Sequence, residues 1–121
     1  MARSFQDLRV WQAAMDLAVD LAAPTERFPR HCQWLAHQIK SSSESGPSNI
    51  AEGFERRLNG DSAKFLRIAK ASIGETESHL TYAWRMRLIN DEEHSRFAEA
   101  RTCVEKMLDQ LISHLLSRAE R

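Results

Sequence analysis

The sequence has few residues that interrupt helices. Its 121 residues include only four glycines and three prolines, and these are the residues that cost most inside a helix. Long stretches consist instead of Ala, Leu, Glu, Arg, Gln and Met, which lose least on entering one. The composition therefore predicts an all-α protein. A chain of this length supports one hydrophobic core but not two, so we expect a single domain spanning residues 1–121.

Neither sign of charge is in excess. Seventeen basic residues face seventeen acidic ones, which leaves no overall field to draw the chain onto nucleic acid or an anionic membrane. A charged partner must therefore be met by a local cluster of side chains.

Long apolar runs and paired cysteines are also missing. No stretch approaches the roughly 20 apolar residues that a membrane-spanning helix needs, and the first residues lack the apolar segment of a signal peptide. We therefore expect a cytoplasmic protein without a membrane partner. Cys32 and Cys103 lack a C-x-x-C partner, so both are expected to be free thiols in a reducing cytosol.

Apolar residues recur every three or four positions in four stretches, which is the pattern of amphipathic helices. The clearest stretches cover about 8–22, 65–88 and 97–116, and a less regular one begins near Cys32 and resumes at Ile50. Short connections return each helix alongside the one before it. The sequence thus predicts an antiparallel, up-down-up-down four-helix bundle.

Turn and capping residues place the three connections. Two prolines put the first at about 24–31. Asn59-Gly60 is predicted to turn the chain before Asp61 or Ser62 caps the third helix, and Asp91 is predicted to cap the fourth. The segment 40–49 has no large apolar residue and is rich in serine, so whether it is a helix or a linker is left open.

Basic residues gather around the second connection and the first turns of the third helix. Such a cluster can neutralise several phosphates even in a chain without net charge. The alternative, which we favour, is a solvated helix face with ordinary ion pairs. The candidate nucleic-acid-binding residues are Arg56, Arg57, Lys64, Arg67 and Lys70.

A second candidate is a polar cluster. Asn49 and Glu52 share a helix face because they are three residues apart, and Glu75 could approach them from the third helix. A ligand or metal pocket is one interpretation. We favour a structural one, in which these groups satisfy each other, Arg56 or nearby backbone, because a metal site needs more converging ligands.

No catalytic constellation is present in the sequence. The five histidines lack H-E-x-x-H spacing, and the serines at 41–45 have neither a base that can be identified nor a G-x-S-x-G turn. We therefore expect no enzyme activity, no bound metal and no cofactor. Trp11, Trp34 and Trp84 fall on or beside apolar stripes and are expected to pack in the core or at a subunit interface.

Several ordered stretches resemble a family of four-helix bundle proteins found in intervening sequences of large-subunit ribosomal RNA genes and elsewhere in bacteria. The accessory protein of diversity-generating retroelements is similar to the same group. The most specific element is the run Asn-Ile-Ala-Glu-Gly. The matching segments are Phe5–Ala13, Phe28-Pro29, Leu35–Ile39, Pro47–Arg56, Phe65–Ser72 and Glu75.

The resemblance implies a bundle that assembles into a ring, typically a homopentamer, and for the retroelement relative it implies binding to nucleic acid and a reverse transcriptase. This chain departs from the family pattern before its Pro-Ser-Asn. Ser41 follows Lys40 where a second basic residue is usual, and Glu44 and Gly46 stand where Val and Ile are common. The expectation of RNA binding and of a rigid second helix is correspondingly weaker.

The function expected from these features is that of a non-enzymatic, self-assembling scaffold or accessory interaction module. The alternative is an RNA- or DNA-binding accessory protein that uses the basic cluster. A ring of identical subunits would cover apolar surface through a heterologous interface. Val10, Trp11, Leu66 and Ile73 are then expected to divide between the core and that interface.

Overall fold

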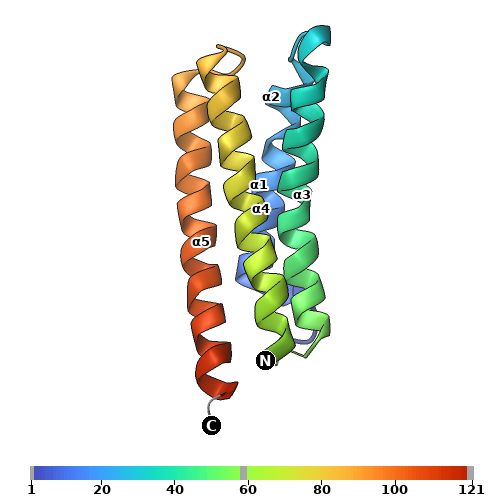
Figure 1. Cartoon of the computed structure of the whole chain (residues 1–121), viewed down its shortest axis with the longest axis vertical. Coiled ribbons are helices and arrows are strands. Elements are labelled where there is room, and N and C mark those ends of the chain that lie inside the picture. The colour runs from blue at the N-terminus through green and yellow to red at the C-terminus, as the bar shows by residue number, and fades with distance from the viewer. Residues whose placement is uncertain (1, 58–59, 120–121) are drawn as a thin grey trace.

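The computed structural model describes residues 2–57 and 60–119, and within these ranges the chain forms an all-α antiparallel four-helix bundle, as predicted (Figure 1). The first rod is broken into two pieces, and short 3-10 turns precede the first and second rods. The elements are η1 (Phe5–Asp7), α1 (Arg9–Asp20), α2 (Ala22–Glu26), η2 (Arg30–Cys32), α3 (Gln33–Glu55), α4 (Gly60–Arg85) and α5 (Asp91–Ala119).

The helices follow one another around the bundle in the order α1, α3, α4 and α5. Helices α1 and α4 each pack against both α3 and α5, so they occupy opposite corners. The end of α1, the start of α3 and the end of α4 all lie at the same end of the bundle (Figure 1). The end of α3 and the start of α4 lie at the other end.

The core runs along the bundle axis between these four rods. Burial of each large aliphatic side chain contributes about 1.5–3 kcal/mol, so these residues dominate the stability of the fold. Of the four residues expected to divide between the core and an interface, Val10, Leu66 and Ile73 belong to this core, whereas Trp11 is half-buried. The largest fully buried apolar side chains are those of Leu21, Leu35, Ile39, Ile50, Leu66, Ile73, Leu108 and Val104.

The first helix ends close to the first connection that the prolines predicted at about 24–31. Helix α1 stops at Asp20, and Pro24 lies within the short α2 that follows. Proline fits near the start of a helix because the first N–H groups have no intrahelical acceptor. Pro29 then provides the extended residue before η2. The break begins about three residues earlier than predicted.

Segment 40–49 is helical, which settles the question that the sequence left open. Helix α3 is continuous from Gln33 to Glu55 and carries Pro47 in its interior. A mid-helix proline costs about 3 kcal/mol, but Pro47 is fully buried, and its burial offsets part of that cost. A Cβ added at Gly46 would lie 3.2 Å from Cγ1 of Ile73, so the small residues of this segment allow α4 to come close.

The predicted caps of the last two helices are each displaced by a residue or more. Helix α4 already begins at Gly60, which places Asp61 and Ser62 inside its first turn; Asn59, the predicted turn residue, lies outside the described residues. The Ser62 hydroxyl instead donates to the carbonyl of Gly53 at 2.7 Å. Asn90 rather than Asp91 caps α5, because its Oδ1 accepts the N–H of Glu93 at 2.8 Å.

Candidate functional site

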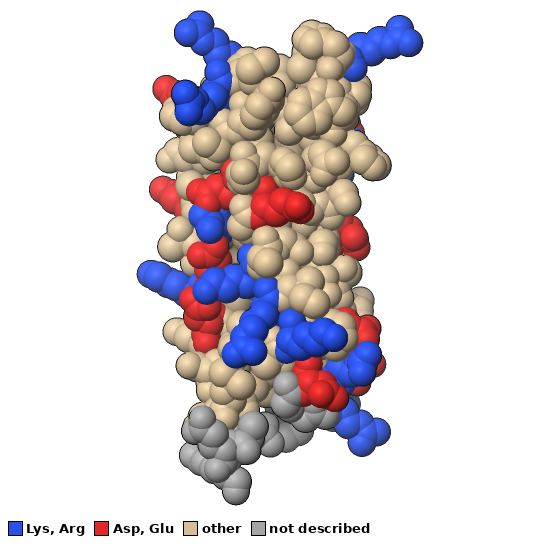
Figure 2. Space-filling view, in the orientation of Figure 1, with Lys and Arg blue, Asp and Glu red and all other residues tan. Residues whose placement is uncertain are grey.

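The predicted basic residues surround the α3–α4 end of the bundle. Arg56 and Lys64 both lie over the ring of Phe65, at 4.9 and 5.8 Å from its centroid. Arg57, just beyond the end of α3, and Arg67 on α4 are exposed nearby. Figure 2 shows Lys and Arg side chains gathered over the lower part of the molecule, with acidic side chains beside them.

Two of the five basic residues are already engaged in ion pairs. Arg56 pairs with Glu52 at 3.2 Å, one turn away. Lys70 donates to Asp109 of α5 at 2.7 Å, and this hydrogen bond to a carboxylate raises the pKa of Lys70. Arg57, Lys64 and Arg67 are therefore the members of the cluster best placed to meet a phosphate.

Arginines close α3 and α4 in an uncommon backbone conformation. Arg57 has φ 61° and Arg87 has φ 63°, in the left-handed region where glycine usually ends a helix and other residues lose about 1–2 kcal/mol. The favourable interaction of a cation with the helix dipole at the C-terminus offsets part of this conformational cost. Arg87 also lines an open groove of about 510 Å³ beside Trp84.

The three residues of the predicted polar cluster have separate neighbours. Asn49 donates from Nδ2 to the carbonyl of Ser45 at 2.8 Å, and Glu52 pairs with Arg56. Ser43 of α3 is about level with Glu75 of α4, because the hydrogen bonds below join residues 42 with 76 and 45 with 72. Asn49 is six residues after Ser43, so at about 1.5 Å per residue Glu75 and Asn49 are about 9 Å apart along the bundle axis.

Hydroxyl groups join α3 to α4 along the line where the helices meet. Ser45 and Ser72 share a hydrogen bond of 2.9 Å, and the Thr76 hydroxyl lies 2.8 Å from that of Ser42. The Ser42 hydroxyl in turn donates to the carbonyl of Ile39. Of the serines at 41–45, Ser42 and Ser45 thus form hydrogen bonds between the two helices.

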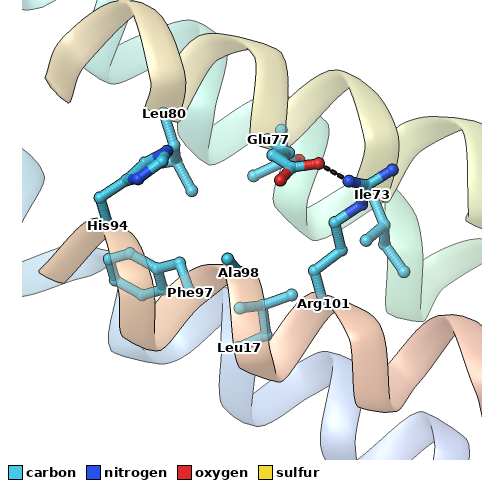
Figure 3. Close-up of a pocket in the computed structure, with 9 residues that line it drawn as sticks. Leu17, Ile73, Glu77, Leu80, His94, Phe97, Ala98 and Arg101 are labelled. Atoms are coloured by element: carbon cyan, nitrogen blue, oxygen red, sulfur yellow. Dashed lines mark ion pairs between the residues drawn. The ribbon is translucent and has the colours of Figure 1, made fainter. Parts of the chain in front are cut away.

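The enclosed cavity between α1, α4 and α5 is too small for a substrate. Its volume is about 10 Å³, which is at most the space of one water molecule. Its wall is mainly apolar, and Glu77 of α4 and Arg101 of α5 reach toward each other at one side, joined by an ion pair (Figure 3). Arg101 also pairs with Glu105 at 2.6 Å.

The histidines and acidic residues show no metal-binding arrangement within the described ranges. In residues 2–57 and 60–119, no group of three or more His, Cys, Asp or Glu could hold an ion. His94 stacks on Trp84, with ring centroids 4.4 Å apart, and the Trp84 Nε1–H donates to Asp91 at 2.8 Å. These side chains therefore fix the corner between α4 and α5.

An exposed aromatic patch lies where α3 begins and α4 ends, and the sequence did not predict that its residues come together. Trp34 at the start of α3 and Tyr82 near the end of α4 meet edge to face at 5.8 Å, and Met86 follows Tyr82 by one turn. Their exposed fractions are 55%, 49% and 53%. We call these three residues the aromatic patch. Of the three tryptophans, Trp11 and Trp84 are half-buried, and only Trp34 faces solvent widely.

The sequence signal for the patch lay in the periodicity. Tyr82 and Met86 are four residues apart and fall outside the apolar stripe of α4, which contains Leu80 and Ala83. Large apolar residues off the stripe predict surface exposure. None of the described helices is long and apolar enough to cross a bilayer.

The fold and its surfaces define a small all-α four-helix bundle whose exposed features are an aromatic patch and a basic cluster. A family model described as 23S rRNA-intervening sequence protein matches residues 6–110. The chain therefore belongs to the 23S rRNA-intervening sequence protein family, and the resemblance found in its motifs is confirmed. No curated protein matches the chain.

Proposed function

We propose that this protein is a non-enzymatic accessory module that assembles with copies of itself. The observation that carries the proposal is the aromatic patch, in which Trp34 and Tyr82 meet edge to face and, like Met86 one turn after Tyr82, are about half exposed. Scattered exposed apolar residues are ordinary, but aromatic residues and methionine grouped together are typical of protein interfaces. Assembly would remove their apolar surface from water.

The proposed assembly is a closed ring, a homopentamer, as the family resemblance implies. The protein would then act as a scaffold that presents several identical surfaces to a partner.

The mass of the protein in solution tests this proposal. Sedimentation velocity at micromolar concentration should give a mass several times the 13.9 kDa of one chain. The double variant Trp34→Ala/Tyr82→Ala should dissociate while keeping its helical circular dichroism spectrum, since both side chains are exposed. Leu116→Ala, an exposed apolar residue on α5, is the matched control and should assemble normally. A wild-type protein that stays monomeric contradicts the proposal.

We propose nucleic-acid binding as the second candidate function. It is favoured by the grouping of Arg57, Lys64 and Arg67 at one end of the bundle, where all three are exposed and could contact phosphates. The resemblance to the retroelement accessory protein, which implies nucleic-acid binding for that relative, also supports this candidate. Within an assembly the same cluster would be repeated on every subunit, and repeated weak sites can bind far more tightly than one.

Fluorescence anisotropy with a structured RNA and a random duplex, from low to physiological salt, tests this second function. The logarithm of the affinity should fall linearly with the logarithm of the salt concentration. Arg57→Ala/Arg67→Ala should reduce that slope by about two, whereas the control Lys106→Ala on α5 should leave it unchanged. Absence of binding even at low salt would exclude this candidate.

A further inference from the structure

We propose that the aromatic patch of one copy receives the outer face of α1 from a second copy, centred on Val19. This inference rests on the proposed self-assembly and names the two surfaces that meet. It follows from the exposure, charge and height of two regions on different sides of the bundle.

The outer face of α1 carries an apolar centre with acidic neighbours. Val19 is the most exposed of the large apolar residues described, with an exposed fraction of 62%. Asp16 and Asp20 are exposed beside it on the same face, and Ala23 continues the exposed surface into α2. Both carboxylates lack an ion-pair partner among the described residues.

The aromatic patch has the complementary arrangement, an apolar centre with basic neighbours. Arg30 precedes Trp34 by four residues and Arg85 follows Tyr82 by three, and both arginines are exposed. Neither forms an ion pair with another described residue. Figure 2 shows a broad uncharged area in the upper part of the molecule, with Lys or Arg side chains at its upper edges.

Charge favours contact between the aromatic patch of one copy and the α1 face of another over contact between two identical surfaces. Contact between two patches would bring Arg30 and Arg85 against the same arginines of the other copy, and contact between two α1 faces would oppose four carboxylates. Like charges brought together in this way cost several kcal/mol. Contact between the patch and α1 instead joins two carboxylates to two guanidinium groups around an apolar centre.

The positions of the two surfaces on one subunit allow this contact to close a ring. The two surfaces lie on different sides of one subunit, so the contact is heterologous: it leaves one copy with an unused α1 face and the other with an unused aromatic patch, and each can bind a further copy. Val19 near the end of α1, Trp34 at the start of α3 and Tyr82 near the end of α4 lie at the same end of the bundle (Figure 1). Successive subunits therefore need little shift along the axis, which favours a ring over a filament.

Charge reversal tests the pairing directly. Asp16→Arg/Asp20→Arg and Arg30→Glu/Arg85→Glu should each raise the apparent dissociation constant of the assembly by about tenfold or more. The chain carrying all four substitutions should assemble like the wild type, since the unlike charges are restored. Lack of rescue in this fourfold variant, with circular dichroism showing it folded, would overturn the inference.

A mixing experiment tests whether the contact joins two different surfaces, the aromatic patch and the α1 face. Trp34→Ala/Tyr82→Ala keeps the α1 face, and Val19→Asp keeps the aromatic patch. Each variant alone should be monomeric, and an equimolar mixture should give a dimer with one copy of each that grows no further. Normal assembly of Val19→Asp alone would overturn the inference and leave the proposed self-assembly standing, whereas a monomeric wild type would overturn both.

Discussion

Helix α4 has two neighbours, and it is joined to them in different ways. Toward α3 it presents small residues and hydroxyls, such as Ser72 and Thr76, which reach hydrogen-bond partners on α3 at 2.8–2.9 Å. Toward α5 it presents longer charged side chains, Lys70 and Glu77, which form ion pairs with Asp109 and Arg101, and α5 approaches α4 less closely than α3 does. We call these contacts the α3–α4 seam and the α4–α5 seam.

The difference shows how side-chain size sets the spacing of helices. In the α3–α4 seam, glycine and serine let the backbones approach, so that short hydroxyls can bond directly. In the α4–α5 seam, Glu77 and Arg101 bridge the helices beside a cavity of about 10 Å³. Close packing makes the first seam sensitive to volume, while the second should respond to charge and salt.

The largest effect is expected from adding volume to the α3–α4 seam. At Gly53 a Cβ would lie 3.3 Å from both the Ser62 carbonyl oxygen and Cδ2 of Leu66. Since backbone cannot move aside as a side-chain tip can, Gly53→Val should lower the free energy of unfolding by about 2–3 kcal/mol. Urea unfolding followed by circular dichroism measures this change.

Gly74 on α4 provides the matched control. A Cβ there would meet only the Arg101 guanidinium, at an ordinary 3.8 Å. Gly74→Ala should therefore raise the free energy of unfolding by about 0.5–1 kcal/mol, because alanine is the better helix former. Similar effects at the two glycines would contradict the difference in spacing between the seams.

Hydroxyl deletion in the same seam should have an intermediate effect. Thr76→Val keeps the shape of the side chain but removes the hydroxyl, which lies 2.8 Å from the Ser42 hydroxyl and 2.9 Å from the Ser72 carbonyl oxygen, at a cost of about 1 kcal/mol. Ser42→Ala should cost a similar amount, and the double variant should cost about 0.5 kcal/mol less than the two together. Strict additivity of the two unfolding free energies would mean that the hydroxyls do not cooperate.

The same two seams explain what the sequence could predict of the fold. Large apolar residues at helical spacing mark α1, α4 and α5 most clearly, and the short connections predicted the antiparallel direction of all four helices. Segment 40–49 gave no such signal, because Ser42, Ser43 and Gly46 are buried through contact with α4 rather than through their own hydrophobicity. Burial of this kind depends on a partner that helix periodicity in one segment does not reveal.

Surface features were predictable only where they depend on local sequence. The basic cluster is contiguous in the chain and lies at one end of the bundle as expected. The aromatic patch joins Trp34 to Tyr82, which are 48 positions apart in the sequence, and depends on the register between α3 and α4. The predicted proximity of Glu75 to Asn49 required the same register, and the hydroxyl bonds place these residues at different heights.

A smaller effect, dependent on pH, is expected where α5 begins. Burial raises the pKa of Glu93, but the N–H of Asn90 and the Arg27 guanidinium outweigh it and hold that pKa below its ordinary value. A lowered folded-state pKa stabilises the protein above the unfolded value of about 4.3, and this stabilisation is lost as the pH falls. Glu93→Gln should cost about 0.5–1 kcal/mol at neutral pH and nothing at pH values where Glu93 is protonated. An equal cost at both pH values in urea unfolding would contradict this account.

The smallest effect should come from the exposed pair of the α4–α5 seam. Lys70 and Asp109 keep 42% and 57% of their side-chain surface exposed, so water and salt screen their attraction. Lys70→Gln should lower the free energy of unfolding less than any change above, and the difference from wild type should disappear at high salt.

Thr76→Val should keep its full cost at the same salt concentration, because a buried hydroxyl pair carries no net charge to screen. Unfolding of both variants at low and high salt therefore separates the two seams in one experiment. A cost of Lys70→Gln that is independent of salt would show that Lys70 stabilises the α4–α5 seam by packing and not by its charge.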